Sequence, residues 1–339
     1  MNQVKVQSMQ KKILVIRFSS IGDIVLCTPV PRLLKKTFPS AEIHFLTKPG
    51  YQDLLLENPY IHQVHVLDKH PLLKAYELKQ LGFDCIIDLH VNTRTLFFKS
   101  ILNIPAYSFP KINLEKWIAV QLKQPALAPI HIVDRYIQTL EVFGIQNDHQ
   151  GLDFFINQNE IAFSKNLLPP SHQTFVAWAI GAQHVTKQFP ADKIIAVLLQ
   201  TKLPIVLLGG KEDLAVAENI CNQFPQQVIH FCGKLSIRQS AAIVKLSKFI
   251  ISNDTGLMHI AAAFKKPIIS IWGNTIPAFG MSAYYGHHQI SHVAIENNEL
   301  NCRPCSKIGF HTCPKVHFNC MRGLNEQIIL TTIGEFWKA

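Results

Sequence analysis

The chain has 339 residues, 48% of them hydrophobic and 17% charged, which is typical of a globular protein long enough for two domains with a core each. No apolar run reaches the roughly 18 residues that suggest a membrane span, and the opening MNQVKVQSMQKK lacks the apolar core of a secretory signal, so we expect a cytoplasmic protein. The net charge of +10 favours anionic partners, but the sequence carries none of the common nucleic-acid-binding patterns, so nucleic acid is not an expected partner.

Short runs rich in Ile, Val and Leu alternate with longer helical patterns, which predicts parallel strands joined by crossover helices. In the first half, strands are expected at residues 12–18, 42–48, 64–68 and 85–90. In the second half, they are expected at residues 175–181, 204–210, 228–233, 249–253 and 267–273. The pattern therefore predicts an α/β fold with two doubly wound units.

The polar segment 156–173 ends near a Pro pair and is predicted to link these units. We therefore expect an N-terminal domain over residues 1–160 and a C-terminal domain over residues 173–324. The closing residues 325–339 have the pattern of an amphipathic helix with Asn325 as its N-cap.

In open parallel sheets, ligands bind beyond the carboxyl ends of the strands, and the first such turn carries Ser20, Gly22 and Asp23. Asp23 either caps the following helix or offers a carboxylate that accepts a proton from an attacking hydroxyl. Gly22 and Ser20 would let a substrate approach the backbone closely. The turn lacks the glycine spacing of a P-loop or a dinucleotide fingerprint, which counts against phosphate hydrolysis and NAD chemistry.

Two further turns carry candidate donor-binding residues. Thr186 and Lys187 precede a helix that starts near Pro190, where a lysine and backbone N–H groups could hold an anion together, although a solvated loop lysine is an equal alternative. Glu212 follows the strand at 204–210, where it either hydrogen-bonds a ribose diol or lies on the surface at a helix start.

The stretch SNDTGLMHIAAA places Asp254, Thr255 and Gly256 between a strand and a helix, with His259 near the helix start. Free N–H groups there, the Thr255 hydroxyl and His259 would suit a pyrophosphate. Asp254 fits less simply, because a carboxylate repels phosphate unless it caps the helix or contacts a sugar hydroxyl. The alternative is that Asp254 is an N-cap and His259 an ordinary helix residue.

Together these motifs resemble family 9 of the glycosyltransferases, the heptosyltransferases of lipopolysaccharide core synthesis. The motifs are SSIGDIVLCTPV, TKQFP, GGKED and SNDTGLMHIAAA with WGNT downstream, and the resemblance runs from about Ile13 to Arg322. It implies the GT-B fold, in which two Rossmann-like doubly wound parallel-sheet domains face each other across a cleft. It also implies that the C-terminal domain holds most of a nucleotide-sugar donor.

The resemblance assigns roles to individual residues. Asp23 matches the proposed general base, Lys187 the lysine on the donor phosphates, and Glu212 the acidic residue near the donor ribose. The remaining donor motif is matched by Asp254, Thr255, Gly256 and His259. Phe189 stands where the family often has Trp, which leaves Lys187 in place.

The function implied by the resemblance is inverting transfer of heptose from ADP-L-glycero-D-manno-heptose to a lipid A-linked inner-core acceptor. No cofactor is required if Lys187 and the N–H groups near Thr255 stabilise the departing diphosphate. An anionic lipid-linked acceptor predicts peripheral contact of the basic protein with the inner membrane. The alternatives are another nucleotide-sugar donor, a nucleotide-sugar epimerase, and a nucleotide-sugar binding protein without transferase activity.

Four cysteines near the end of the chain form a C-x2-C-x7-C-x6-C pattern: Cys302, Cys305, Cys313 and Cys320. Four thiolates can close a tetrahedral zinc site, which makes a structural zinc one interpretation. The spacing is shorter than in common zinc ribbons, and reduced or disulfide-linked cysteines are the alternative. His311 and His317 are spare candidate ligands, whereas His287, His288 and His292 are expected to be solvated loop histidines.

Overall fold

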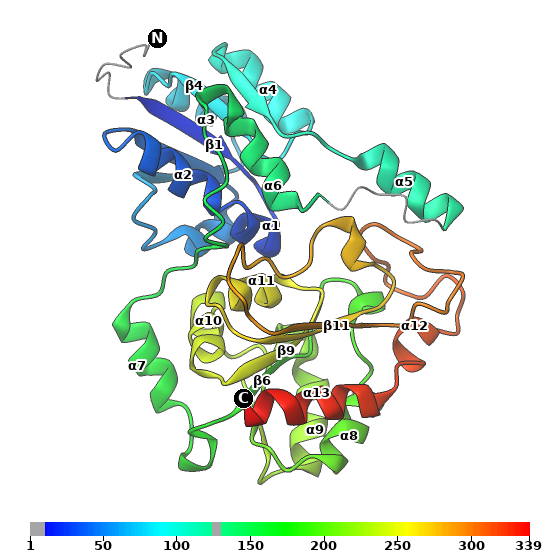
Figure 1. Cartoon of the computed structure of the whole chain (residues 1–339). Helices are drawn as coiled ribbons and strands as arrows, with labels where there is room; N and C mark the ends of the chain where they lie inside the picture. Colours follow the sequence, from blue (N-terminus) through cyan, green and yellow to red (C-terminus); the bar gives the residue numbers. More distant parts are fainter. Residues whose placement is uncertain (1–10, 124–129) are drawn as a thin grey trace. The chain divides into compact units, whose positions relative to one another are not determined.

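The computed structural model describes residues 11–123 and 130–339. Most of the opening stretch MNQVKVQSMQKK therefore lies outside the described residues. The chain divides into two compact units, which Figure 1 shows coloured along the sequence. Unit 1 comprises Met1–Lys111 with Ile132–Asp148, and unit 2 comprises Ile112–His131 with His149–Ala339.

Unit 1 contains a five-stranded parallel sheet in the order β3-β2-β1-β4-β5. Its strands are β1 (Lys12–Ile16), β2 (Glu42–Thr47), β3 (Gln63–Val66), β4 (Cys85–Asp88) and β5 (Ala106–Ser108). The central strands are buried over most of their length, because crossover helices cover a parallel sheet on both faces.

The helices of unit 1 are α1 (Ile21–Leu26), α2 (Pro29–Thr37), α3 (Pro71–Gln80), α4 (Thr93–Leu102) and α6 (Ile132–Ile137), with 3-10 turns η1 (Pro49–Leu55) and η2 (Gln138–Phe143). Apolar residues of α3 and α4 pack on side chains of β1, β2 and β4 in one core cluster. The neighbours of α2 are β2 and α6. Pro29 is the first residue of α2, so the chain accommodates it by ending α1 and starting a second helix.

Unit 2 contains a six-stranded parallel sheet in the order β11-β10-β9-β6-β7-β8. Its strands are β6 (Val176–Ala179), β7 (Ile205–Leu208), β8 (Val228–His230), β9 (Phe249–Asn253), β10 (Ile268–Trp272) and β11 (His292–Glu296). Relabelled from β6 onward, the order is 3-2-1-4-5-6, that of a Rossmann sheet. The strand order reverses between β6 and β9, and the equivalent reversal in unit 1 lies between β1 and β4.

The helices of unit 2 are α5 (Asn113–Leu122), α7 (Gln158–Asn166), α8 (Ala191–Gln200), α9 (Leu214–Gln223), α10 (Ile237–Leu246), α11 (Gly256–Ala263), α12 (Asn319–Arg322) and α13 (Glu326–Lys338), with 3-10 turns η3 (Pro170–His172), η4 (Val185–Lys187), η5 (Lys211–Asp213) and η6 (Pro277–Phe279). Side chains of α8, α9 and α13 share one core cluster with the sheet. The other helix pair, α10 and α11, pack on each other, and Figure 1 shows them apart from α8, α9 and α13.

The predicted α/β class is confirmed, and all nine predicted strands are present within a few residues of their expected bounds. Strands β5 and β11 were not predicted from the sequence. Both are edge strands, and they are only partly buried, so they lack the continuous apolar run that marks a central strand. The predicted closing helix is confirmed as α13, with Asn325 as its N-cap. The Asn325 side chain accepts a hydrogen bond from the Gln327 N–H at 2.9 Å.

The compact units divide the chain differently from the predicted domains. The predicted linker 156–173 contains α7, which packs on α10 within unit 2. Glu160 of α7 forms an ion pair with Arg238 of α10, with a Glu160 Oε1 to Arg238 Nε distance of 2.5 Å. Residues 112–131 and 149–160 belong to unit 2, although they were predicted to lie in the N-terminal domain.

None of the helices within residues 11–123 and 130–339 is both long enough and apolar enough to cross a membrane.

Candidate functional site

The predicted donor motif of unit 2 contains an ion pair at the point where the strand order reverses. Lys187 follows β6, Asp254 follows β9, and the distance from Lys187 Nζ to Asp254 Oδ2 is 2.6 Å. The Thr275 hydroxyl donates to the same carboxylate oxygen at 2.9 Å. Only 16% of the Lys187 side chain and 11% of the Asp254 side chain are exposed. Asp254 therefore positions and neutralises Lys187 in this structure.

A buried asparagine fixes the segment that carries Lys187. Asn253 is fully buried at the end of β9, and its amide nitrogen donates to the Ile180 carbonyl at 2.8 Å. Its amide oxygen accepts the Phe189 N–H at 3.2 Å. One side chain thus joins the end of β6 to Phe189, two residues after Lys187, which limits how far the lysine can move.

Helix α11 begins next to this ion pair. Thr255 is its N-cap residue, with extended backbone, and Gly256 is its first residue. The interpretation of Asp254 as the helix cap is therefore wrong, because the cap lies one residue later. The first-turn N–H groups of an α-helix have no intrahelical acceptors, so this helix start can receive an anion beside Lys187. His259 lies at the end of the first turn and is 2% exposed.

The other two candidates of unit 2 have different surroundings. Thr186 is 2% exposed, and its hydroxyl donates to the Phe310 carbonyl at 3.1 Å while accepting the Phe310 N–H at 2.8 Å. This pairing fastens η4 to the loop that holds the cysteines. Glu212 is exposed within η5, as the surface alternative also requires. Neither arrangement tests a contact with a donor, so both roles remain predictions.

Asp213, next to Glu212, was missed by the sequence analysis. Its carboxylate accepts the Gly210 N–H at 2.8 Å and a weaker bond from Gln188 Nε2 at 3.4 Å. Burial raises the pKa of Asp213 and the neighbouring Glu212 charge adds to this rise, although the Gly210 bond opposes it. Two glycines after strands could have indicated this close approach: Gly181 follows β6 and Gly209 follows β7. A Cβ at Gly181 would lie 2.0 Å from Asp213 Oδ2, and one at Gly209 would lie 2.6 Å from it, so the Asp213 carboxylate needs glycine at both positions.

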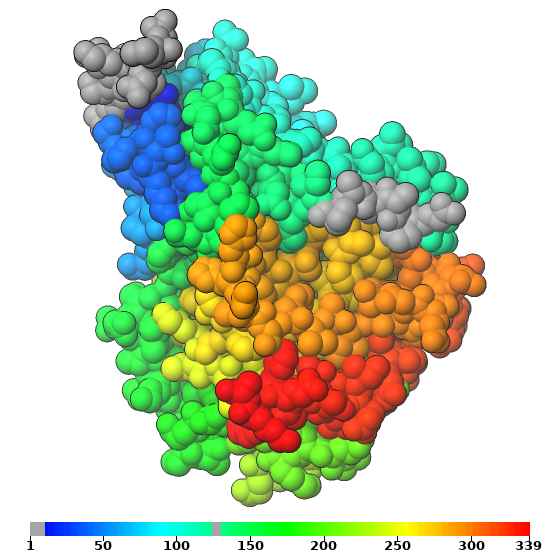
Figure 2. Space-filling model, in the orientation of Figure 1, coloured from blue at the N-terminus to red at the C-terminus, as the bar shows by residue number. Residues whose placement is uncertain are grey.

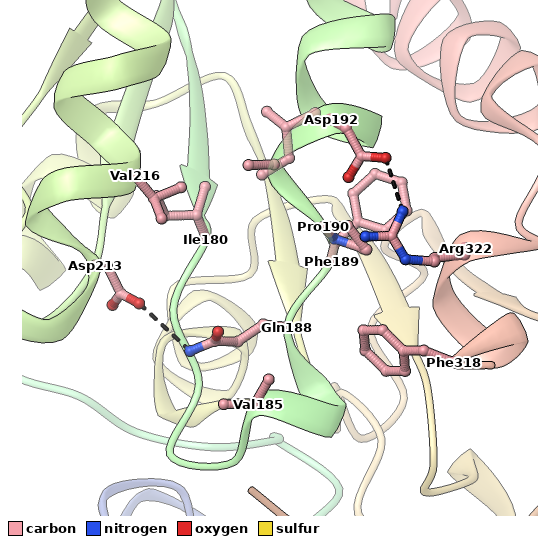
Figure 3. Close-up of a pocket in the computed structure, with 12 residues that line it drawn as sticks. Ile180, Val185, Gln188, Phe189, Pro190, Asp192, Asp213, Val216, Phe318 and Arg322 are labelled. Carbon is pink, nitrogen blue, oxygen red and sulfur yellow. Dashed lines mark hydrogen bonds and ion pairs between the residues drawn. The ribbon is translucent and has the colours of Figure 1, made fainter. Parts of the chain in front are cut away.

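Asp213 lines a cavity of about 400 Å³ beside η4. Figure 3 shows Ile180 and Val216 on the side of the Asp213–Gln188 hydrogen bond, and Phe189 on the opposite side with the Asp192–Arg322 ion pair. The pair joins Asp192 Oδ2 to Arg322 Nη1 at 3.0 Å. Lys187, Asp254 and Thr255 do not line this cavity, so it is separate from the donor motif.

The candidate base of unit 1 is held by three donors. Ser20 is the N-cap of α1, and its backbone N–H and its hydroxyl donate to Asp23 Oδ2 at 3.1 and 2.8 Å. Arg17 Nη2 lies 2.7 Å from Asp23 Oδ1. Asp23 is therefore the third residue of the helix and the carboxylate half of a capping box, so the interpretation of Asp23 as the N-cap itself is wrong.

These contacts keep Asp23 ionised. Burial alone would raise its pKa, but the Arg17 charge and the Ser20 hydrogen bonds outweigh burial and lower the pKa below the ordinary 3.8. A lowered carboxylate pKa stabilises the fold above the pKa of the unfolded chain, and this contribution is lost as pH falls through the folded value. The carboxylate that would accept a proton is thus present throughout the neutral range.

Arg17 was also missed by the sequence analysis. Arg17 is 8% exposed, and its guanidinium donates to the Ser19 carbonyl at 2.7 Å and to the Leu89 carbonyl at 2.6 Å, besides pairing with Asp23. Arg17 thereby joins the turn after β1 to the turn after β4, at the strand-order reversal of unit 1. His90 lies beside it, and burial together with the Arg17 charge lowers the His90 pKa to about 4. Arg17 interrupts an apolar run between Ile16 and the buried Phe18, and only that position at the end of β1 could have marked it.

The four cysteines of the C-x2-C-x7-C-x6-C pattern are all reduced. Cys320 is buried, and burial first, then the neighbouring thiols, raises its pKa to about 12. Over residues 11–123 and 130–339, three or more potential metal-ligand atoms gather within 4.8 Å of one another only at Glu42, His44 and His62. The sulfur atoms of the four cysteines do not reach this mutual distance of 4.8 Å, so a zinc site at the cysteines remains a prediction.

Elemental analysis of the purified protein tests the cysteine site. A structural zinc at the cysteines should make the zinc content of the unmodified protein exceed that of Cys302→Ala by about one metal per chain, since a tetrahedral site needs all four ligands. Metal far below one equivalent in the unmodified protein would rule out a tightly bound structural ion at these cysteines.

Comparison with known proteins places this geometry in context. Residues 75–310 match Glycosyltransferase family 9 (heptosyltransferase). The chain is 24% identical over 310 residues to lipooligosaccharide heptosyltransferase 2 of Haemophilus ducreyi, which covers 79% of this chain and 85% of that protein. Among solved structures, a family 9 glycosyl transferase from Veillonella parvula has a TM-score of 0.76 at 21% identity, covering 98% of both chains. The E. coli ADP-heptose lps heptosyltransferase II has a TM-score of 0.73 at 18% identity, covering 96% of this chain and 98% of that one.

Proposed function

The chain belongs to glycosyltransferase family 9 and has the GT-B fold, and on that premise we propose that it transfers heptose from ADP-L-glycero-D-manno-heptose to a lipid A-linked inner-core sugar. The premise makes it a glycosyltransferase, and the proposal concerns its donor and its acceptor. Support for the donor comes from the relative whose own substrate is named as ADP-heptose and from the lipooligosaccharide heptosyltransferase that the chain resembles.

One observation carries the proposal: a neutralised lysine beside the start of an eight-residue helix, at the strand-order reversal of a Rossmann sheet. Lys187, paired with Asp254, can contact one side of a diphosphate, and the N–H groups at the start of α11 can contact another. Both contacts strengthen as negative charge develops on the departing nucleoside diphosphate, which favours the transition state over the bound donor.

Asp23 supplies the complementary step in this proposal. As the acceptor hydroxyl attacks the anomeric carbon, its proton passes to the Asp23 carboxylate, the bond between that carbon and the phosphate oxygen breaks, and ADP leaves. Arg17 and Ser20 fix the orientation of the Asp23 carboxylate, so it does not need to reorient before it accepts the proton of the acceptor hydroxyl. The cost is a weaker base, because the same contacts lower the pKa of Asp23.

Ligand-induced stabilisation tests the donor proposal. Binding only to the folded state raises the free energy of unfolding by about 2.7 kcal/mol at a ligand concentration 100 times Kd. We expect ADP and ADP-heptose to raise the unfolding temperature, with no comparable effect from UDP or GDP. Stabilisation by UDP or GDP alone would replace the ADP-heptose donor by another nucleotide sugar. Conversion of the donor sugar without any acceptor would indicate an epimerase.

A peripheral membrane contact is part of the proposal, and the outer face of α5 supports it. Leu114, Trp117 and Leu122 are 66%, 57% and 65% exposed, while Ala119 on the other face packs with Ile276 and Phe279. Helix α5 lies at the surface in Figure 2. A helix with an apolar outer face, an exposed Trp and neighbouring lysines suits the interface of an anionic bilayer, in a chain whose net charge is +10.

Sedimentation with phosphatidylglycerol vesicles tests this contact. The double substitution Leu114→Ser with Trp117→Ser should weaken vesicle binding at least ~10-fold, because each side chain contributes about 1.5–3 kcal/mol when buried in an apolar phase. Leu199→Ser is the matched control, since Leu199 is a 63% exposed leucine on α8. Equal binding of the double variant and the control would exclude α5 as the docking element.

A further inference from the structure

A second group of potential metal ligands lies in unit 1, at the amino ends of the strands, whereas Asp23 follows the carboxyl end of β1. Glu42 and His44 are at the amino end of β2, two residues apart, so both project from the same face of the strand. The His62 N–H donates to the Ile43 carbonyl at 2.8 Å, which brings His62 beside them. The ligand atoms of Glu42, His44 and His62 lie within 4.8 Å of one another.

The central member of this group has a ring nitrogen that the described residues do not satisfy. His44 is 3% exposed, and its Nε2 atom is buried without a hydrogen-bond partner within residues 11–123 and 130–339. The nearest carboxylate oxygen, Glu42 Oε2, is 3.6 Å away, which is beyond a normal hydrogen bond. A buried polar atom without a hydrogen-bond partner destabilises the folded state, so we expect His44 Nε2 to bind a ligand.

The opposite nitrogen of the same ring shows how that ligand would be bound. His44 Nδ1 lies 2.8 Å from His65 Nε2, so one of the two nitrogens carries the shared hydrogen. When His44 Nδ1 carries it, His44 Nε2 has a lone pair that can bind a metal, and this atom lies 3.6 Å from Glu42 Oε2. Metal-bound histidines commonly donate their second ring nitrogen to an outer partner in this way. Stacking on His65 and an edge contact with Phe83 hold the His44 ring in place.

We propose that Glu42, His44 and His62 bind a Zn²⁺ ion. Two imidazole nitrogens and one carboxylate oxygen form a ligand set that zinc accepts, and they differ from the all-oxygen sets of Mg²⁺ and Ca²⁺. Three protein ligands leave a fourth position for water. The group lies at the amino ends of the strands, whereas Asp23 follows the carboxyl end of β1, so the ion stabilises unit 1 and takes no part in transfer.

Lys12 competes for the same carboxylate. It lies opposite Glu42 in the β1–β2 pairing, and its Nζ atom is 3.3 Å from Glu42 Oε2. Without the metal, the Lys12 ammonium group compensates the charge of the Glu42 carboxylate. With the metal bound, Zn²⁺ and the Lys12 ammonium group both contact that carboxylate and repel each other. Removing Lys12 should therefore tighten zinc binding, while removing a ligand should weaken it. Substitutions of Lys12 and of a metal ligand are thus expected to change the zinc affinity in opposite directions.

The test uses the full-length protein, stripped with EDTA and titrated with Zn²⁺ at neutral pH by calorimetry, with the unfolding temperature as a second readout. His62→Gln should weaken binding at least ~10-fold, the lower end of the cost of disturbing even an outer partner of a metal ligand. His62 is exposed, so this change leaves the core intact. Lys12→Gln should bind zinc more tightly than the unmodified chain. His70→Gln, at another exposed histidine of unit 1, should leave binding unchanged.

Co²⁺ separates this site from the cysteines. Thiolate-bound Co²⁺ has an intense charge-transfer absorption that Co²⁺ bound by nitrogen and oxygen lacks, so the ion lost in His62→Gln should be one without that absorption. Equal zinc binding by the unmodified chain and His62→Gln would overturn the proposal. Loss of a thiolate-type band in that variant would also overturn it, because the site would then belong to the cysteines.

Discussion

Replacing Asp23 with asparagine is expected to lower kcat at least ~100-fold, the lower end of general-base contributions, while donor binding is retained. Asparagine keeps the size of the side chain and can still accept from the Ser20 N–H, but it cannot take the proton of the acceptor hydroxyl. Donor affinity should change little, because the donor motif lies in unit 2. Steady-state kinetics and ligand-induced stabilisation by ADP measure the two effects separately.

Two further variants make this result interpretable. Asp23→Asn leaves the Arg17 guanidinium without its carboxylate, so the unfolding temperature must be measured alongside kcat. Asp23→Glu keeps the charge that pairs with Arg17 but moves the carboxylate by one methylene, and it should lower kcat while preserving stability. Asp84→Asn, which changes an exposed carboxylate of the same unit, should leave kcat unchanged. Near-normal turnover in Asp23→Asn would remove Asp23 from the base role.

Lys187→Gln is expected to lower kcat/KM by ~10²–10³, the cost of removing one group that stabilises developing negative charge. In this chain the effect has two parts. The lysine contact with the diphosphate is lost, and the Asp254 carboxylate, 2.6 Å from Nζ, is left uncompensated close to the donor phosphates. The second part is specific to the pairing seen here and can be measured separately.

The double variant Lys187→Gln with Asp254→Asn measures that second part. Removing both charges eliminates the repulsion, so the double variant should recover at least ~5-fold in kcat/KM over Lys187→Gln, a coupling of about 1 kcal/mol. Lys202→Gln, at an exposed lysine before β7, is the control and should behave like the unmodified chain. A double variant no better than Lys187→Gln would mean that Asp254 acts on the donor itself and does not merely neutralise the lysine.

The fold was largely predictable because a parallel sheet buries both faces of its central strands. Runs such as KILVIRF and FIISN therefore show strongly in the sequence, and β1 and β9 lie where those runs predict them. The edge strand β11 has no such run, because part of it faces solvent. The helix α7 was missed because it buries Ser164 and no apolar residue, so its sequence has no apolar stripe. Its place on α10 depends on a Glu160–Arg238 ion pair that a local sequence pattern does not predict.

The site was predicted only in part, for a related reason. Residues such as Asp23 and Asp254 stand out because each lies between the end of a strand and the end of the first turn of the next helix, where open parallel sheets bind ligands. Their partners do not stand out: Arg17 lies within the apolar run KILVIRF, and Lys187 is 67 residues before Asp254. Which carboxylate meets which cation is set by the order of strands in the sheet, and β6 and β9 are neighbours only in the folded chain.

The most direct test of the central claim is the mass of a lipid A-linked inner-core acceptor after incubation with the protein and ADP-L-glycero-D-manno-heptose. We predict that the acceptor gains one heptosyl residue, that ADP is released in equal amount, and that Asp23→Asn largely abolishes both. An acceptor of unchanged mass with this donor, together with a mass gain from a different nucleotide sugar, would contradict the proposed reaction.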